Sequence, residues 1–184
     1  MKAIYTTTSL SHLYKVKTFI ETFAPLHQDV RIYVVMVETV DAEKEQAIAE
    51  LLPEAIMLYP RHLPEAERAS VNPAYNFFEA CCAYRPFFAE LLFGTGYEID
   101  RLIYMDSDLL QYDSIEPAFE KLLSHPFLLT PHNTEPAPLS EVEQEQGMHR
   151  CGIYNAGFIG LRRSAETTRF LAWWKDRMRQ LCVA

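Results

Sequence analysis

Two apolar segments near the start of the chain, separated by one helix-length stretch, constrain its fold more than any other feature. Residues 30–37 form an almost continuously apolar run, and residues 2–7 are rich in β-branched and aromatic side chains, so each predicts a β-strand. The apolar residues between them recur at helical spacing: Leu13, Val16, Ile20 and Phe23. A strand, a helix and a second strand in that order favour a parallel pair with a crossover helix, and hence an α/β protein.

The rest of the chain continues this alternation. Further strands are predicted at residues 55–59, 101–105, 127–130 and 157–161, and further helices at 41–52, 72–86, 115–123 and 164–181. Asn72-Pro73 is expected to open its helix, and Pro86 to kink that helix or to begin a second one. Residues 131–152, with three prolines and a run of Glu and Gln, predict a long polar loop. Trp173 and Trp174 are assigned to the core, because aromatic residues at helical spacing are usually buried.

Length and charge exclude several classes of protein. A chain of 184 residues suits one domain, here residues 1–184 with an open, mainly parallel sheet flanked by helices. The net charge of −8 argues against a nucleic-acid or membrane-surface binder, and no transmembrane segment or signal peptide is expected. The four cysteines form no C-x-x-C pair, which predicts reduced thiols in a cytoplasmic protein: Cys81, Cys82, Cys151 and Cys182.

Two carboxylates end the most apolar of the later strands. Asp106 and Asp108 follow the run Arg101-Leu102-Ile103-Tyr104-Met105 and, two residues apart, share one side of an extended segment. At the carboxyl end of a parallel strand they lie where such sheets bind ligands. Carboxylate oxygens suit Mn²⁺ or Mg²⁺, although exposed turn residues would give the same short pattern. The pair is therefore a candidate site for a divalent metal and a diphosphate.

Three ordered motifs carry a family resemblance. R-L-I-Y-M-D-S-D-L-L (residues 101–110) resembles the D-x-D signature of GT-A-fold glycosyltransferases, in particular the bacterial group related to glycogenin and the lipopolysaccharide galactosyltransferases. A-Y-R-P-F-F-A-E-L-L-F (83–93) resembles that family's helix with a basic residue ahead of the D-x-D strand. Y-N-A-G-F-I-G-L-R-R (154–163) resembles its Asn-x-Gly motif beside the donor sugar. The resemblance implies a GT-A, Rossmann-like fold over nearly the whole chain.

The resemblance also implies a function and a set of site residues. A hexose would pass from a nucleotide-diphosphate sugar, by family frequency a UDP-sugar, to a saccharide, lipid-linked or protein acceptor. Asp106 and Asp108 would bind Mn²⁺ or Mg²⁺ with the donor phosphates, and Asp106 would also contact the nucleotide. The other implied contacts are Thr6, Thr7 and Ser9 for the nucleotide, and Arg85, Asn155, Ala156 and Gly157 for the phosphate and sugar. His132 is a further candidate for a sugar or acceptor contact, although a loop histidine is more often simply exposed.

The sequence departs from the family in two places. Ser9 stands where many relatives have Asp, and His12 where many have Tyr, which bears on the identity of the base. Relatives also usually continue well beyond the helix that follows Asn-x-Gly. The alternatives are therefore a non-catalytic nucleotide-sugar-binding fragment or inactive remnant and, with less support, a haloacid-dehalogenase-type phosphatase. The phosphatase class normally places its D-x-D nucleophile on a first strand near the N-terminus.

Overall fold

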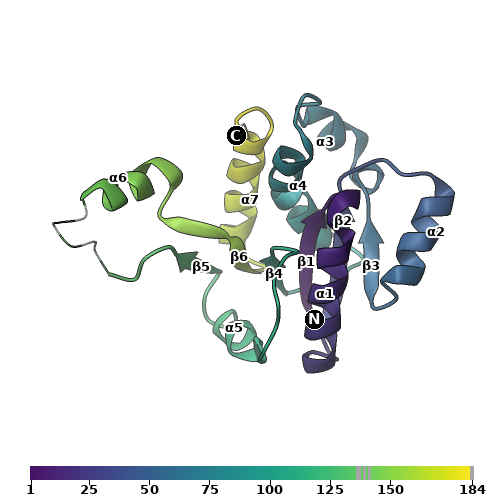
Figure 1. Cartoon of the computed structure of the whole chain (residues 1–184), viewed down its shortest axis with the longest axis horizontal. Helices are drawn as coiled ribbons and strands as arrows, with labels where there is room; N and C mark the ends of the chain where they lie inside the picture. Colours follow the sequence, from purple (N-terminus) through teal and green to yellow (C-terminus); the bar gives the residue numbers. More distant parts are fainter. Residues whose placement is uncertain (136–137, 139, 141, 183–184) are drawn as a thin grey trace.

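The chain forms one mixed sheet in the order β3-β2-β1-β4-β6-β5 (Figure 1). The structure is a computed structural model and describes residues 1–135, 138, 140 and 142–182. The strands are β1 (Lys2–Thr8), β2 (Arg31–Met36), β3 (Ala55–Leu58), β4 (Arg101–Met105), β5 (Phe127–Pro131) and β6 (Tyr154–Arg162). Strands β3, β2, β1 and β4 are parallel, whereas β6 runs antiparallel to both β4 and β5. The predicted open, mainly parallel α/β sheet is confirmed.

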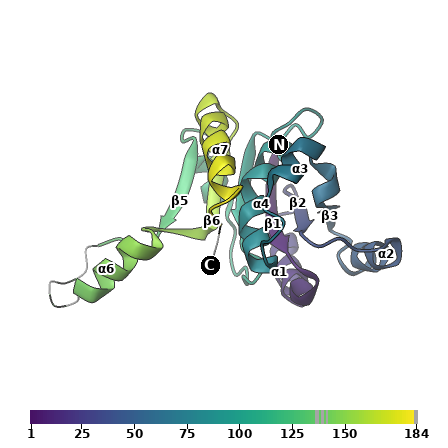
Figure 2. The same cartoon turned by 90° about the horizontal axis from the view of Figure 1, so that it is seen from above.

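Helices cover both faces of this sheet (Figures 1 and 2). They are α1 (Leu13–Phe23), α2 (Ala42–Leu51), α3 (Glu65–Ser70), α4 (Phe77–Leu92), α5 (Glu116–Lys121), α6 (Val142–Cys151) and α7 (Ala165–Met178). Short 3₁₀ turns lie at η1 (Leu10–His12), η2 (Ala24–Leu26) and η3 (Pro60–His62). None of the described helices has the length and apolar character needed to cross a membrane.

Two hydrophobic clusters pack against opposite faces of the sheet, because successive strand residues point to opposite sides. One contains Tyr5 and Tyr104 with Phe88 of α4 and residues of α7. The other contains Ile4 and Ile103 of the same strands, with α1 and α5 residues such as Phe19. Burial on both faces explains why the central strands are almost continuously apolar in sequence.

Helix α4 begins later than the sequence predicts. Asn72 is not its cap: the Asn72 side chain accepts a hydrogen bond from the Ala74 N–H in a turn outside the helix. The cap is Asn76, whose side chain accepts from the Glu79 N–H at 2.9 Å while Glu79 reaches back to the Asn76 N–H at 2.8 Å. Pro86 lies within the helix without ending it, because buried α4 residues on both sides of it pack on the sheet.

The polar region before β6 is the other departure. The sequence predicts a loop throughout residues 131–152, but helix α6 occupies Val142–Cys151 and β6 begins at Tyr154. Glu and Gln are good helix formers, which accounts for a helix without a marked apolar stripe. Both views show α6 projecting away from the sheet (Figures 1 and 2). Trp173 also differs from expectation, since 57% of it is exposed, whereas Trp174 is half-buried and packs against the hydrophobic cluster on its face of the sheet.

Candidate functional site

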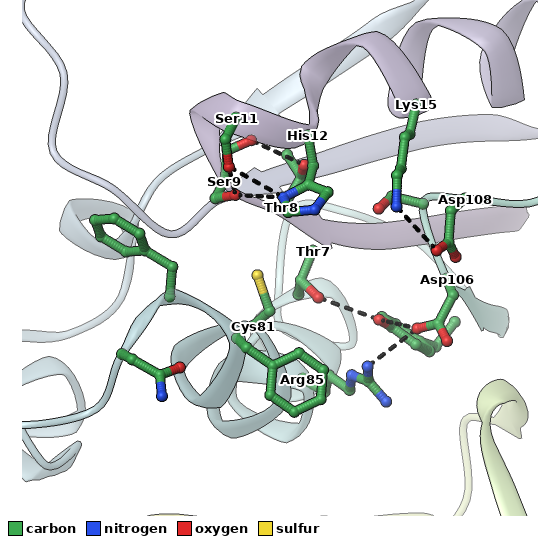
Figure 3. Close-up of a pocket in the computed structure, with 15 residues that line it drawn as sticks. Thr7, Thr8, Ser9, Ser11, His12, Lys15, Cys81, Arg85, Asp106 and Asp108 are labelled. Carbon is green, nitrogen blue, oxygen red and sulfur yellow. Dashed lines mark hydrogen bonds and ion pairs between the residues drawn. The ribbon is translucent and has the colours of Figure 1, made fainter. Parts of the chain in front are cut away.

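A cleft of about 430 Å³ opens where β1 and β4 end, between the start of α1 and the start of α4 (Figure 3). Its position at the carboxyl ends of parallel strands is the usual ligand-binding edge of an α/β sheet. The residues that line it come from three separate stretches of the chain: Thr7, Thr8, Ser9, Ser11, His12, Lys15, Asn76, Phe77, Phe78, Cys81, Arg85, Tyr104, Asp106, Ser107 and Asp108. Both aspartates therefore share one cleft with Arg85, Thr7 and Ser9.

Arg85 joins the three sequence motifs. Its Nη2 donates to Asp106 Oδ1 at 3.0 Å, and its Nη1 donates to the Ala156 carbonyl at 3.0 Å. Only 8% of Arg85 is exposed, and its guanidinium lies 4.3 Å from the centre of the Tyr104 ring. A planar fork with several donors can hold a carboxylate and a carbonyl at once, which a Lys ammonium cannot do as well. The predicted phosphate contact thus also orients one predicted metal ligand.

The Tyr104 hydroxyl holds the Asp106 side chain through a hydrogen bond. Burial raises the pKa of Tyr104 well above its usual value, against the opposing effect of the Arg85 charge. The phenol consequently keeps its proton and donates it to Asp106 Oδ1 at 2.8 Å. Because the Tyr104 proton is used in that hydrogen bond, the Tyr104 oxygen acts as the acceptor for Thr7 Oγ1, which lies 3.1 Å away. A buried hydroxyl chain therefore connects β1 to the first aspartate.

The Asn155-Ala156-Gly157 segment packs directly beside Asp106. The Asp106 N–H donates to the Gly157 carbonyl at 2.9 Å, and the Gly157 N–H donates to Asn155 Oδ1 at 2.6 Å. A Cβ at position 157 would lie 2.6 Å from Asp106 Oδ2, so glycine is needed here for close approach. Asn155 is exposed, and its side-chain oxygen is held by Gly157 while the amide nitrogen keeps its donors.

Asp108 lies at the open side of the cleft opposite Lys15. Their side chains are 54% and 30% exposed, and Lys15 Nζ is 3.4 Å from Asp108 Oδ2. Among the residues that the structure describes, no group of three or more His, Cys, Asp and Glu side chains could hold a metal ion unaided. Two carboxylates nevertheless suit Mg²⁺ or Mn²⁺, because such ions are often held by one or two carboxylates together with substrate phosphates. The two carboxylates therefore suit a metal ion that is bound together with a diphosphate.

The other predicted contacts fall inside and outside the cleft. Ser9 lies at its wall, with its hydroxyl 3.0 Å from both Ser11 Oγ and His12 Nδ1. Thr6 is buried on the opposite face of β1 from Thr7 and is absent from the lining residues, and its Oγ1 has no partner in the described structure. His132 is exposed, and its backbone N–H donates to the Ile153 carbonyl beside the β5–β6 pair. It too is absent from the cleft lining, and so are Asn155, Ala156 and Gly157, which lie behind Asp106 and Arg85.

Several lining residues had no signal in the sequence. Lys15 lies on an otherwise ordinary polar helix face, and Tyr104 is one of several aromatic strand residues. Phe77 and Phe78 are 57% and 69% exposed at the first turn of α4, which the sequence placed inside a longer helix. Only the observed helix start brings both rings to the cleft.

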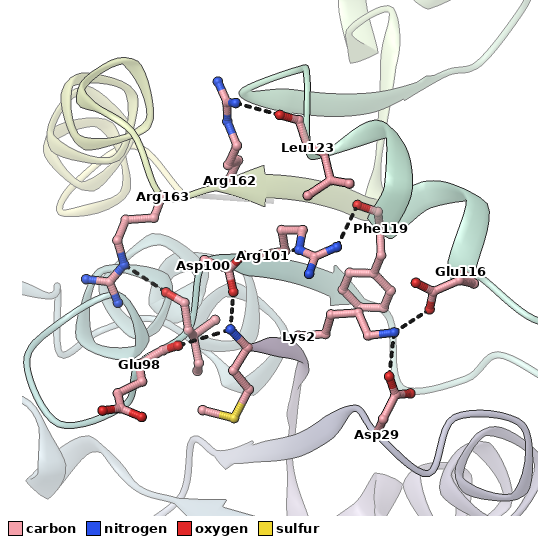
Figure 4. Close-up of polar contacts among 12 residues, drawn as sticks. Lys2, Asp29, Glu98, Asp100, Arg101, Glu116, Phe119, Leu123, Arg162 and Arg163 are labelled. Atoms are coloured by element: carbon pink, nitrogen blue, oxygen red, sulfur yellow. Dashed lines mark hydrogen bonds and ion pairs between the residues drawn. The ribbon is translucent and has the colours of Figure 1, made fainter.

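A second group of charged residues lies at the amino ends of the same strands (Figure 4). Lys2, at the start of β1, pairs with Asp29 at 2.6 Å and with Glu116 at 2.5 Å. Arg163, just after β6, donates to the Ile99 carbonyl at 2.8 Å. These contacts fasten loops at the end of the sheet remote from the cleft, so we assign them a structural role.

Comparison with known sequences gives a distant relative. No protein-family model matches the chain. The uncharacterized protein YfnF of Bacillus subtilis (strain 168) is 26% identical over 182 residues, which are 98% of this chain and 59% of YfnF. The chain thus spans less than two thirds of that relative's length.

Comparison with solved structures is more informative about the fold. Galactosyltransferase LgtC, in complex with donor and acceptor sugar analogues, superposes with a TM-score of 0.61 at 14% identity, covering 98% of this chain and 66% of LgtC. Mouse xyloside xylosyltransferase 1 in its apo form gives 0.59 at 14% identity, covering 95% and 74%. A 4-diphosphocytidyl-2C-methyl-D-erythritol synthase from Anaerococcus prevotii DSM 20548 gives 0.55 at 10% identity, covering 98% and 78%. At these identities the likeness establishes a common fold, shared by proteins with different reactions.

Proposed function

We propose, from the GT-A fold that this chain has, that it forms the donor-binding part of a metal-dependent glycosyltransferase. The donor would be a nucleotide-diphosphate hexose, with uridine as the base. The observation that carries the proposal is the convergence of Arg85, Asp106 and the Asn155–Gly157 segment at one end of the sheet. A turn or a surface loop would not need a buried arginine, a buried tyrosine and a close glycine to hold one carboxylate.

The described residues supply distinct parts of a donor site. When bound, an Mn²⁺ or Mg²⁺ ion held by Asp106, Asp108 and the donor phosphates would stabilise negative charge on the departing nucleotide. Lys15 is close enough to Asp108 to offer a second positive charge to phosphate oxygens. The Asn155 amide can donate to sugar hydroxyls, and Thr7 and Ser9 present hydroxyls to the nucleotide side. The acceptor is proposed only by class: a saccharide, a lipid-linked sugar or a protein.

Calorimetric titration of the chain with UDP, with and without Mn²⁺, tests the donor site. We expect binding that requires Mn²⁺ and is weakened at least about tenfold by Asp108→Asn, which removes a ligand charge without changing shape. Asp176→Asn is the matched control: its side chain is 56% exposed, against 54% for Asp108, and it lies on α7 away from the cleft. Unchanged Mn²⁺-dependent binding by Asp108→Asn would show that the metal assignment is wrong.

A UDP-release assay on the same chain distinguishes an enzyme from a binding module. Slow release of UDP from a UDP-hexose, with water as the acceptor, would indicate that the transfer chemistry is present in this chain. Metal-dependent UDP binding without release would favour a donor-binding fragment. The phosphatase alternative loses its support, because the aspartates follow the fourth strand of a GT-A sheet and not its first.

A further inference from the structure

Two cysteine thiols that are distant in sequence meet beside the cleft. Cys82 lies on α4, and Cys182 lies four residues beyond the end of α7. Cys182 Sγ lies 3.4 Å from the Glu79 carbonyl, one turn before Cys82 on α4, so the Cys182 side chain lies beside the part of the helix that carries Cys82. Both thiols are free.

The structure holds Cys182 in this position through its backbone. The Cys182 N–H donates to the Tyr75 hydroxyl at 3.0 Å, and that hydroxyl donates to the Met178 carbonyl at 3.0 Å. Arg179 anchors the same segment, because its carbonyl accepts from the Asn72 N–H at 3.2 Å. The segment after α7 is therefore docked on the turn that precedes α4, and the meeting of the two thiols follows from that docking.

The pKa values of the Cys82 thiol and of the neighbouring Cys81 thiol are shifted in opposite directions. The neighbouring Cys182 thiol lowers the pKa of Cys82 below its usual range, opposed by burial and helped by the Arg85 charge. Burial raises the pKa of Cys81 to about 12. Thiolates, not thiols, attack disulfides. Cys82 therefore has a nucleophilic sulfur with a second thiol beside it, while Cys81, which lines the cleft, does not.

We propose that Cys82 and Cys182 are a reversible redox pair, which forms a disulfide by exchange with a low-molecular-weight disulfide such as oxidised glutathione. The Cys82 thiolate attacks one glutathione sulfur, forms a mixed disulfide and releases one glutathione thiolate. Cys182 loses its proton, attacks the Cys82 sulfur and releases the second glutathione. Two protein thiols are oxidised and one glutathione disulfide is reduced to two thiols.

The disulfide would couple the redox state to the neighbourhood of Arg85. It would join α4 covalently to the segment after α7 and remove the negative charge of Cys82 three residues before Arg85. Arg85 holds Asp106 and Ala156, so its surroundings would change while the lining of the cleft stayed the same. Both cysteines are partly exposed, which allows a small disulfide to reach them.

Peptide mapping of the whole chain after treatment with oxidised glutathione tests the pair. Free thiols are blocked by alkylation, and the protein is digested without reduction. We expect a cross-linked peptide containing Cys82 and Cys182, which a reductant abolishes. Cys182→Ser should accumulate a mixed glutathione disulfide at Cys82, because the resolving thiol is missing. Cys81→Ser is the matched control and should form the cross-link like the unmodified chain.

Two results would overturn the proposal. One is the absence of the Cys82–Cys182 peptide from the unmodified chain, or its replacement by a link to another cysteine. The other is mixed-disulfide formation at Cys81 as fast as at Cys82 in Cys182→Ser. A second measurement needs no variant: alkylation of the unmodified chain near pH 7 should label Cys82 faster than Cys81, and equal rates would contradict the assigned nucleophile.

Discussion

Arg85 contributes to packing and also belongs to the proposed donor site. Its guanidinium is buried between α4, the end of β4 and the start of β6, where it satisfies a carboxylate and a carbonyl. Removing one partner of such a group leaves the other unsatisfied, which costs more than the contact itself contributes. A variant of Arg85 would therefore confuse lost binding with lost structure, so gentler changes nearby are more informative.

Gly157→Ala is such a change. The added Cβ would lie 2.6 Å from Asp106 Oδ2 and 2.8 Å from Asn155 Oδ1, so both side chains must move. We expect UDP binding in the presence of Mn²⁺, measured by calorimetry, to weaken about tenfold or more. Gly147→Ala in α6 is the control, because a Cβ there meets nothing within 4 Å. Equal affinities for the two variants would show that Asp106 does not need its observed position.

His62 gives a pH dependence to folding. Its Nδ1 accepts a hydrogen bond from the Tyr59 N–H at 3.1 Å, and burial, followed by the Arg61 charge, lowers the pKa of His62. The folded state therefore prefers neutral imidazole. Above the unfolded-state pKa of about 6.5 the imidazole is neutral in both states, so it does not change the free energy of unfolding. As the pH falls from there towards the lowered folded-state pKa, the unfolded state takes up the proton first and the free energy of unfolding decreases.

Denaturant unfolding at pH 7.5 and pH 5 measures this effect. We expect the unmodified chain to lose more free energy of unfolding between these pH values than His62→Asn, which cannot titrate. Other titrating groups are common to both proteins and cancel in the difference. Parallel losses in the two proteins would show that the imidazole does not favour its neutral form on folding.

At the scale of elements, the start of α4 decides what reaches the cleft. The sequence predicts Asn72 as the cap, whereas the observed start is set by the capping box between Asn76 and Glu79. We predict that Asn76→Ala lowers the free energy of unfolding by about 1 kcal/mol, the usual value of a cap, whereas Asn72→Ala costs less. Denaturant unfolding of both variants tests this order, and the reverse order would move the helix start back to Asn72.

The elements that the sequence predicted well are those in which one signal dominated. Strands β1, β2 and β4 are buried on both faces, so their apolar character is nearly unbroken. Helix α1 has a single buried stripe that includes Val16 and Ile20. Elsewhere two local signals disagreed. Pro86 predicts a break in α4, but the packing of the helix on the sheet outweighs it. The prolines after residue 130 predict a loop, although the Glu and Gln residues that follow them form α6.

At the scale of the whole molecule, the central strands belong to both hydrophobic clusters at once. Phe19 and Phe88 are each 0% exposed and lie on opposite faces. We predict that Phe19→Ala and Phe88→Ala each lower the free energy of unfolding by about 3–5 kcal/mol while unfolding remains a single transition. Circular dichroism and tryptophan fluorescence, followed during the same denaturant titration, test this. Separate transitions for the two probes would mean that the faces unfold independently.

The candidate site was predictable where a motif named its residues and unpredictable where the fold supplied them. Asp106, Asp108, Arg85 and Gly157 were all identified from short patterns, and the structure brings them together. Lys15 could not be found, because its role depends on where α1 lies relative to β4. The family resemblance implies Thr6, and the place of His132 after a strand suggests that residue, but the structure places both outside the cleft lining.

The hydrogen bond between Arg85 and the Ala156 carbonyl joins residues 71 positions apart, and this separation matters for folding during synthesis on the ribosome. A chain growing on the ribosome makes β1, α4 and both aspartates long before it makes the strand that holds them. Until Gly157 emerges, Arg85 lacks one acceptor and the Asp106 N–H has no carbonyl opposite it. The proposed nucleotide-sugar binding should thus be acquired abruptly, once β6 has emerged, and nascent chains halted before β6 should carry both aspartates without a complete site.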